Sequence, residues 1–216
     1  MRNLEKDERE MAERRARMLT VGFRVFSEKT IEVATMKEIA KACGLGYKTM
    51  FRYFGTKTAL VIAIGADIWK KYAVKVEEMY QARGGNAMNA AEELEFFLDC
   101  FLDLYKNHKD ILRFNRNLHI YVRHEGVSPE DIRPYNEVVG VFAMKFHAVY
   151  QKAKLDGTLR IDLPELKFFA SSLHIMLAVS EKYAEGLLYP PNEALDTDLS
   201  DELELLKSMI MQHYLA

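Results

Sequence analysis

Cationic, hydroxyl and aromatic side chains gather just after residue 46, at spacings that put several of them on one side of a short helix. The group consists of Tyr47, Lys48, Thr49 and Arg52. Lys and Arg side chains donate hydrogen bonds to guanine edges in the major groove of DNA, and the methyl group of Thr contacts that of thymine. These residue types therefore predict contacts with the base edges of duplex DNA.

The flanking residues predict the two helices that hold these side chains. Thr35, with Glu38 three positions later, forms a capping box, so a helix is expected to start there. Gly44 can take the left-handed conformation that ends this helix, and a second helix is expected over residues 46–54. Met50 faces inward on that helix and turns the basic residues outward. The pattern is typical of a helix-turn-helix motif, whose second helix lies in the major groove.

Residues around the second helix are expected to contact phosphates. Tyr53, Lys57 and the amides that open the next helix after Thr56 are placed for this, because a helix N-terminus favours an anion. The alternative is a solvated basic face on a small helical bundle, since exposed Lys and Arg are common. The predicted DNA-binding residues are Thr35, Lys37, Gly46, Tyr47, Lys48, Thr49, Arg52, Tyr53 and Lys57.

The segment over about residues 15–60 resembles the DNA-binding domain of the TetR family of transcriptional repressors. The matching residues, in the family's order and spacing, are Phe26, Thr35, Ile39, Ala40, Gly44, Thr49, Met50, Tyr53, Phe54, Lys57 and Leu60. Four residues depart from the family's pattern. Thr30 stands where the family usually has Gly, and Gly46 stands where it has Ser or Thr. Lys48 replaces a small residue, and Phe51 replaces Tyr. Phe51 lacks the hydroxyl that a Tyr would offer to a phosphate, and Lys48 leaves the choice of bases open.

Charge is unevenly distributed along the 216 residues. The first 60 residues carry 13 Lys or Arg against 8 Asp or Glu, whereas the whole chain has a formal net charge of -2. A basic head on an acidic body suits a DNA contact at one end only.

Cysteine usage and hydropathy indicate a cytoplasmic protein. Cys43 and Cys100 each lie in an apolar helical pattern, which favours small core residues over a disulfide framework. No apolar run approaches the length of a membrane span, and the charged N-terminal segment lacks the apolar core of a secretion signal.

The pattern of apolar residues, caps and helix breakers predicts an all-α chain of about nine helices. We expect a domain boundary near Leu60, within the fourth helix. Residues 1–60 would form a three-helix helix-turn-helix DNA-binding domain, and residues 61–216 a larger C-terminal helical bundle for effector binding and dimerisation. The expected helices span residues 8–28, 35–42, 46–53, 56–82, 89–106, 109–123, 129–154, 165–188 and 199–214.

A stretch without charge over residues 168–180 predicts a helix that is covered on every side. In so small a chain, one side can pack on its own bundle and the other on a second subunit. This favours an isologous homodimer, which requires DNA with two-fold related half-sites. A central core helix in a monomer is the alternative. The predicted interface residues are Phe168, Ser171, His174, Ala178, Leu206, Ile210 and Tyr214.

Large side chains at helical spacing in the body are typical of packing. The TetR resemblance implies in addition a cavity there for a small effector, whose binding releases a repressor from its operator. Apolar walls with a few polar points suit a flat or amphipathic organic molecule. The candidate effector-binding residues are Trp69, Phe101, Tyr105, Phe114, Leu118, Tyr121, Phe142, Phe146, Tyr150 and Met176.

Catalytic and metal-binding patterns are weak in this sequence. Neither HExxH nor the Glu-x-x-His pattern of helical di-iron sites occurs, and GLGYKT lacks the spacing of a phosphate loop. We therefore expect no enzyme activity, no metal and no cofactor. Two rival functions remain open: a helical protein-interaction scaffold that binds no DNA, and a small-molecule carrier or enzyme that uses the body cavity.

Overall fold

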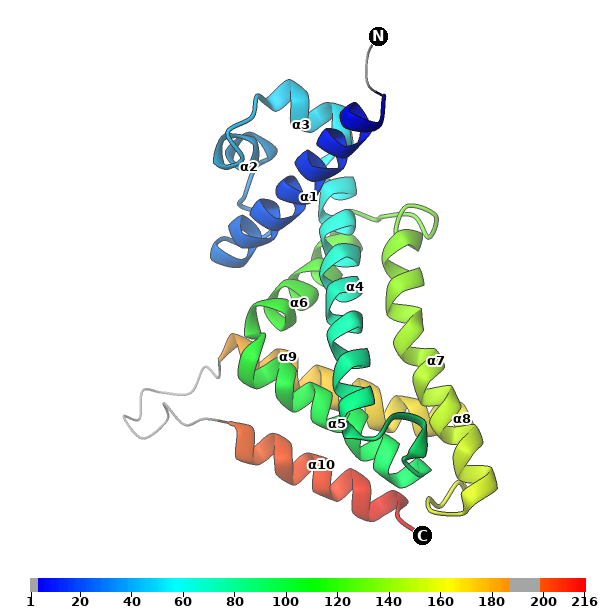
Figure 1. Cartoon of the computed structure of the whole chain (residues 1–216). Coiled ribbons are helices and arrows are strands. Elements are labelled where there is room, and N and C mark those ends of the chain that lie inside the picture. Colours follow the sequence, from blue (N-terminus) through cyan, green and yellow to red (C-terminus); the bar gives the residue numbers. More distant parts are fainter. Residues whose placement is uncertain (1–3, 187–198) are drawn as a thin grey trace. The chain divides into compact units, whose positions relative to one another are not determined.

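The computed structural model describes residues 4–186 and 199–216, and in this part of the chain every regular element is a helix (Figure 1). One isolated antiparallel bridge joins Leu159 to Leu215. No helix among the described residues is both long and apolar enough to cross a bilayer. The predicted all-α fold is confirmed.

The helices begin and end close to the positions expected from the sequence. Within the described residues α8, a π-helical turn and α9 run into one another, which leaves nine helical segments besides a short 3-10 turn. The predicted end of the eighth helix at residue 188 lies outside the described residues. The elements are α1 (Leu4–Glu28), α2 (Met36–Ala42), α3 (Tyr47–Phe54), α4 (Lys57–Arg83), the 3-10 turn (Gly85–Ala87), α5 (Ala90–Asn107), α6 (Lys109–His124), α7 (Arg133–Asp156), α8 (Glu165–Phe169), the π-helical turn (Ala170–His174), α9 (Ile175–Glu185) and α10 (Ser200–Tyr214).

Two starts differ by four residues: α1 begins at Leu4 and not at residue 8, and α7 begins at Arg133 and not at residue 129. The Ser128 hydroxyl does accept from the Asp131 amide at 3.1 Å, as a helix cap would. Pro134, however, has no N–H to bond a carbonyl four residues back, and it disfavours a helical conformation in the residue before it. Residues 129–132 therefore form turns, and Pro134 lies in the first turn of the helix, where a missing N–H costs nothing.

The chain divides into two compact units. The first comprises Met1–Lys70 and Phe114–Val138, and the second comprises Lys71–Arg113 and Val139–Ala216. The expected DNA-binding domain of residues 1–60 thus lies within a larger unit that also holds the first half of α4 and most of α6. Helices α4 and α7 each supply residues to both units.

The first three helices of the first unit pack against one another, and α2 and α3 form the two arms of the expected motif (Figure 1). Phe114 of α6 adds ring contacts to Phe23, at a centroid distance of 5.5 Å, and to Phe26, at 6.3 Å. The fully buried side chains of the head include Met18, Phe26, Ile31, Ile39, Met50, Leu60 and Ile64.

A buried network of hydrogen bonds joins α4 to α6 and α7 inside the first unit. The Asn115 carbonyl oxygen accepts from Trp69 Nε1 at 2.8 Å and from the Tyr135 hydroxyl at 2.6 Å. Tyr135 also bonds His119 Nε2 at 2.9 Å. Beside this network, Gly65 lets α4 approach α6 and α7 closely, because a Cβ there would lie 2.6 Å from Leu118 and 3.0 Å from the Tyr135 ring.

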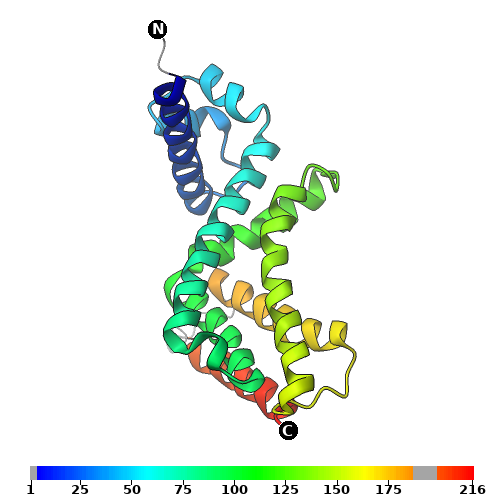
Figure 2. The same ribbon diagram turned by 45° about the vertical axis from the view of Figure 1, so that its right-hand side comes forward.

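In the second unit α5, α9 and α10 lie side by side, as both views show (Figures 1 and 2). Ion pairs link the outer faces of two of these helices: Lys207 of α10 donates to Asp99 of α5 at 2.7 Å. Inside, the carboxylate of Glu93 is 4% exposed and accepts from Lys152 and Tyr80. Burying this carboxylate is tolerable because both partners satisfy it.

The close approach at Gly65 can be tested with two alanine variants. We expect Gly65→Ala to lower the free energy of unfolding by about 1–3 kcal/mol, since Tyr135 is held by two hydrogen bonds and cannot move aside. Gly140→Ala, in the interior of α7, where no atom outside the helix's own neighbouring backbone lies within 4 Å of the added Cβ, should raise it by about 0.5–1 kcal/mol. Denaturant unfolding of both variants measures the difference, and equal effects would contradict the packing described at Gly65.

Candidate nucleic-acid interface

The N-terminus of α2 is closed by reciprocal hydrogen bonds. The Thr35 hydroxyl accepts from the Glu38 amide at 3.2 Å, and the Glu38 carboxylate accepts from the Thr35 amide at 2.8 Å. Lys29 donates to the same carboxylate at 2.8 Å. This hydrogen bond from Lys29, together with those from Thr35, lowers the pKa of Glu38 to about 2. The carboxylate that orders the start of the motif is therefore charged at any physiological pH.

The turn between α2 and α3 is a Schellman closure. Gly44 has a φ of +69°, and its amide donates to the Lys41 carbonyl at 2.9 Å. The next amide, that of Leu45, donates to the Ala40 carbonyl at 2.9 Å. Both bonds use carbonyls that the helix end leaves free, and they turn the chain sharply into α3.

Helix α3 buries one residue completely and exposes a face of cations and aromatic rings. Met50 is 0% exposed, whereas Lys48 and Arg52 are exposed and Tyr47 is 43% exposed. Phe51, which the sequence interpretation did not place among the contact residues, is 52% exposed. Its signal was present, since it lies one helical turn after Tyr47. Thr49 is half-buried, so the exposed face of α3 consists of Tyr47, Lys48, Phe51 and Arg52.

The residues predicted for phosphate contacts differ in their availability. The Tyr53 hydroxyl is buried without a hydrogen-bond partner, so in this structure it does not present itself to a phosphate. Lys57 Nζ donates to the Glu32 carbonyl at 3.0 Å and lies over the Tyr121 ring at 5.6 Å. Its side chain thereby joins α4 to the segment before α2. The remaining predicted residues Thr35, Lys37 and Gly46 are exposed on α2 and the turn.

The start of α4 is capped within the chain. The Thr56 hydroxyl accepts from the Ala59 amide at 3.0 Å, which satisfies one of the free amides of this helix end. The preceding Gly55 closes α3 with a φ of +69° and a bond from its amide to the Phe51 carbonyl at 2.7 Å. The C-terminus of α3 is therefore closed at Gly55, which ends the helix after two turns.

The candidate effector-binding residues fall into the two units. In the first unit they are buried in contacts of their own: the Tyr121 hydroxyl, for example, bonds Thr58 at 3.1 Å. In the second unit Tyr150 donates to the Leu163 carbonyl at 2.8 Å, and the rings of Phe146 and Phe97 lie tilted to each other with their centroids 5.5 Å apart. The first group is Trp69, Phe114, Leu118 and Tyr121, and the second is Phe101, Tyr105, Phe142, Phe146, Tyr150 and Met176.

Two buried hydroxyls flank Met176 in the second unit. Ser172 and Ser180 are each 0% exposed, and neither has a hydrogen-bond partner. They lie four residues before and after Met176, on one stripe of the helical segment that contains the π-helical turn. Buried polar groups are nearly always paired, so two such hydroxyls on one stripe call for an explanation.

The predicted dimer-interface residues are not all on the surface. Phe168 and Tyr214 are buried with their rings 4.8 Å apart, and Ile210 is 8% exposed, so these three hold the second unit together. The Ser171 hydroxyl bonds Tyr214. Among the others, His174 and Ala178 are exposed and Leu206 is half-buried. Apolar side chains that the sequence interpretation did not name are exposed nearby, on α9 (Ile175) and α10 (Leu205 and Met209).

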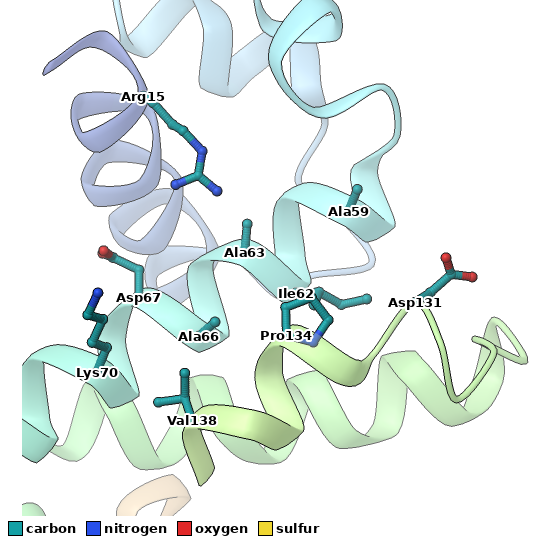
Figure 3. A pocket seen from close by; sticks show the side chains of 10 residues that line it. All are labelled: Arg15, Ala59, Ile62, Ala63, Ala66, Asp67, Lys70, Asp131, Pro134 and Val138. Carbon is teal, nitrogen blue, oxygen red and sulfur yellow. The ribbon is translucent and has the colours of Figure 1, made fainter. Parts of the chain in front are cut away.

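A groove of about 350 Å³ opens on the first unit (Figure 3). Small side chains of α4, such as Ala63 and Ala66, form its floor, and Arg15 of α1 reaches over it. Its volume is within the range of small-ligand sites. Arg15 and Lys70 bring positive charge to it while Asp67 and Asp131 bring negative charge, so its lining favours no single class of ligand.

Metal and thiol chemistry find little support in the described residues. No group of three or more His, Cys, Asp or Glu side chains within residues 4–186 and 199–216 is arranged to hold a metal ion. Burial raises the pKa of the Cys100 thiol to about 12 and raises that of Cys43 above its usual value. Neither thiol supplies a nucleophilic thiolate near neutral pH.

The N-terminal part of the chain is similar to a known protein family. Residues 18–64 match the family model described as bacterial regulatory proteins, tetR family. This range contains the whole helix-turn-helix and the start of α4, and the resemblance predicted for this segment is confirmed. No curated relative matches the sequence.

Solved structures share the fold over nearly the whole chain. A bacterial regulatory protein in the tetR family from Rhodococcus RHA1 is 14% identical with a TM-score of 0.65, covering 93% of this chain and 96% of that one. The transcriptional regulator FadR from Bacillus subtilis, in complex with stearoyl-CoA, is 14% identical with a TM-score of 0.67, covering 92% and 98%. The ketosteroid transcriptional regulator KstR2 of Mycobacterium tuberculosis is 12% identical with a TM-score of 0.60, covering 94% and 95%. The chain therefore has the fold of TetR-family transcriptional regulators.

The buried hydroxyl of Tyr53 leads to a stability prediction. Tyr53→Phe removes a polar group that lacks a partner, so we expect the free energy of unfolding to stay the same or rise by up to about 1 kcal/mol. Tyr121→Phe is the matched control, because its hydroxyl bonds Thr58, and it should lower the free energy by about 1 kcal/mol. If urea unfolding shows both variants losing stability alike, the Tyr53 hydroxyl has a partner in solution.

Proposed function

We propose that this protein is a sequence-specific, DNA-binding transcriptional regulator of the TetR type. The observation that carries the proposal is the exposed face of α3, where Lys48 and Arg52 stand beside two aromatic rings on a helix fixed by a Schellman turn. No acidic residue lies in α3. A rigid basic helix of this kind suits the major groove, and the family match over residues 18–64 supports the same role.

The regulator acts as a homodimer on two-fold related half-sites. Exposed apolar side chains on α9 and α10, namely Ile175, Leu205 and Met209, support this, because residues 4–186 and 199–216 leave them uncovered. Exposed Ala178 of α9 would let a partner helix approach closely. An isologous contact through these helices places two copies of α3 on one duplex.

The second unit binds a small, largely apolar effector, and effector binding releases the repressor from its operator. Supporting this proposal, Ser172 and Ser180 put unpaired hydroxyls among apolar side chains beside Met176. Buried hydroxyls without a partner among the described residues are candidates for hydrogen bonds to a bound ligand. The FadR structure of the same fold was solved in complex with stearoyl-CoA. Binding and release are thermodynamically linked, so the effector must bind the DNA-free protein more tightly.

We propose that the protein is cytoplasmic, because a transcriptional regulator must share a compartment with the DNA that it binds. Its two cysteines, Cys43 and Cys100, are free and buried, and a reducing compartment keeps them so.

The rival functions make other predictions: a scaffold would bind partners with little dependence on salt, and a carrier would bind small molecules without any effect on DNA binding.

DNA binding can be tested by selecting duplexes from a random pool. We expect enrichment of a two-fold related sequence, with an affinity that falls steeply with salt, because cations on the protein displace counterions from the DNA. Lys48→Ala and Arg52→Ala should weaken binding to the selected duplex about tenfold or more and relax base choice. Arg160→Ala is the control: it removes an exposed cation from the second unit and should leave both the affinity for the selected duplex and the base choice unchanged. A pool that yields no enriched sequence would rule out the proposed function.

Dimer formation can be tested by adding charge to the proposed interface. The double variant Leu205→Glu with Met209→Glu should sediment as a monomer and bind the selected duplex at least tenfold more weakly, because burying carboxylates at an apolar interface is costly. Leu155→Glu is the matched control, since that side chain is 89% exposed on α7. Retention of the dimer by the double variant would show that another surface holds the subunits together.

A further inference from the structure

Two aromatic rings stand exposed on the short helix α3. The side chain of Tyr47 is 43% exposed and that of Phe51 is 52% exposed, and their ring centroids lie 6.1 Å apart. The core beneath the helix is completed by Met50, which is fully buried, so the fold itself gains little from the outer rings. Their exposure points to a partner that covers them.

The surroundings of the rings identify the chemistry of that partner. Lys48 and Arg52 flank them on the same face, and α3 has no acidic residue. The surface therefore suits a polyanion that also offers apolar groups at close range. In the major groove of duplex DNA the only apolar group on a base edge is the C5-methyl of thymine.

Phe51 decides between the possible contacts. Its side chain has no donor or acceptor, so it can neither bond a phosphate nor read a base edge through a hydrogen bond. An apolar contact is the only favourable one that it can make in the groove. We propose, on the basis of the proposed function, that Phe51, supported by the ring of Tyr47, contacts a thymine methyl group in each half-site and so determines specificity for thymine there.

The experiment deletes the methyl group from the DNA and the ring from the protein. A duplex selected from a random pool by the wild-type protein is remade with each thymine replaced in turn by deoxyuridine, which pairs identically but lacks the methyl. For the wild type, one position in each half-site should lose about fourfold in affinity on this replacement, as expected for one lost methyl contact. Phe51→Ala should bind the unmodified duplex about tenfold more weakly and should no longer distinguish thymine from deoxyuridine at that position.

Control variants separate this contact from others. Leu155→Ala, which removes an exposed aliphatic side chain from the second unit, should keep the full response to deoxyuridine. Thr49→Ser tests the rival contact, because Thr49 is the other predicted base-contacting residue on α3 with a methyl group; if Phe51 makes the contact, this variant still distinguishes thymine from deoxyuridine at that position. Thermal unfolding of Phe51→Ala should match the wild type, because the ring is exposed.

The outcomes distinguish this inference from the function on which it rests. If a sequence is enriched and Phe51→Ala remains sensitive to the same methyl groups, or if Thr49→Ser alone abolishes the sensitivity, the role of Phe51 is overturned and DNA binding stands. If the wild-type protein enriches no sequence, the proposed function fails and the inference fails with it.

Discussion

The closed turn between α2 and α3 is the constraint on which the presentation of the exposed side chains of α3 depends. Gly44 takes a left-handed conformation that costs a residue with a Cβ about 1 kcal/mol or more, and two backbone bonds then set the direction of the chain. Helix α3 is only two turns long and gains little stability from propensity, so its angle comes from this turn and from the burial of Met50. Relaxing the turn would misdirect every exposed side chain of α3 together.

The head of the chain is braced by residues far along the sequence. Asn115 accepts from Trp69 and Tyr135, and the absence of a side chain at Gly65 lets α4 approach α6 and the start of α7. A movement of Phe114–Val138 would therefore be felt along the first half of α4, since packed interiors do not deform continuously. The position of the first half of α4 is therefore tied to that of residues 114–138 within the first unit.

Some residues of α8 and α10 that helical spacing predicted for a dimer interface are buried inside the second unit. The rings of Phe168 and Tyr214 meet inside the second unit, so they stabilise its fold, and the large apolar side chains that stay exposed on α10 are Leu205 and Met209. The same principle separates Tyr53 from the other residues of α3, because its hydroxyl is enclosed. Helical spacing identifies a face, but the neighbouring helices decide whether that face is covered.

The sequence alone determined the approximate positions of the helices and the helix-turn-helix motif. Caps, turns and apolar periodicity act between residues that are a few positions apart, so Thr35 with Glu38 and the glycine after α2 could be interpreted locally. Only the tertiary structure decided which side chains remain accessible and where the units divide. Those outcomes depend on partners such as Asn115 and Trp69, 46 residues apart, whose contact no local pattern encodes. Exposed Phe51 shows the same limit, because its ring is available only where no distant segment covers it.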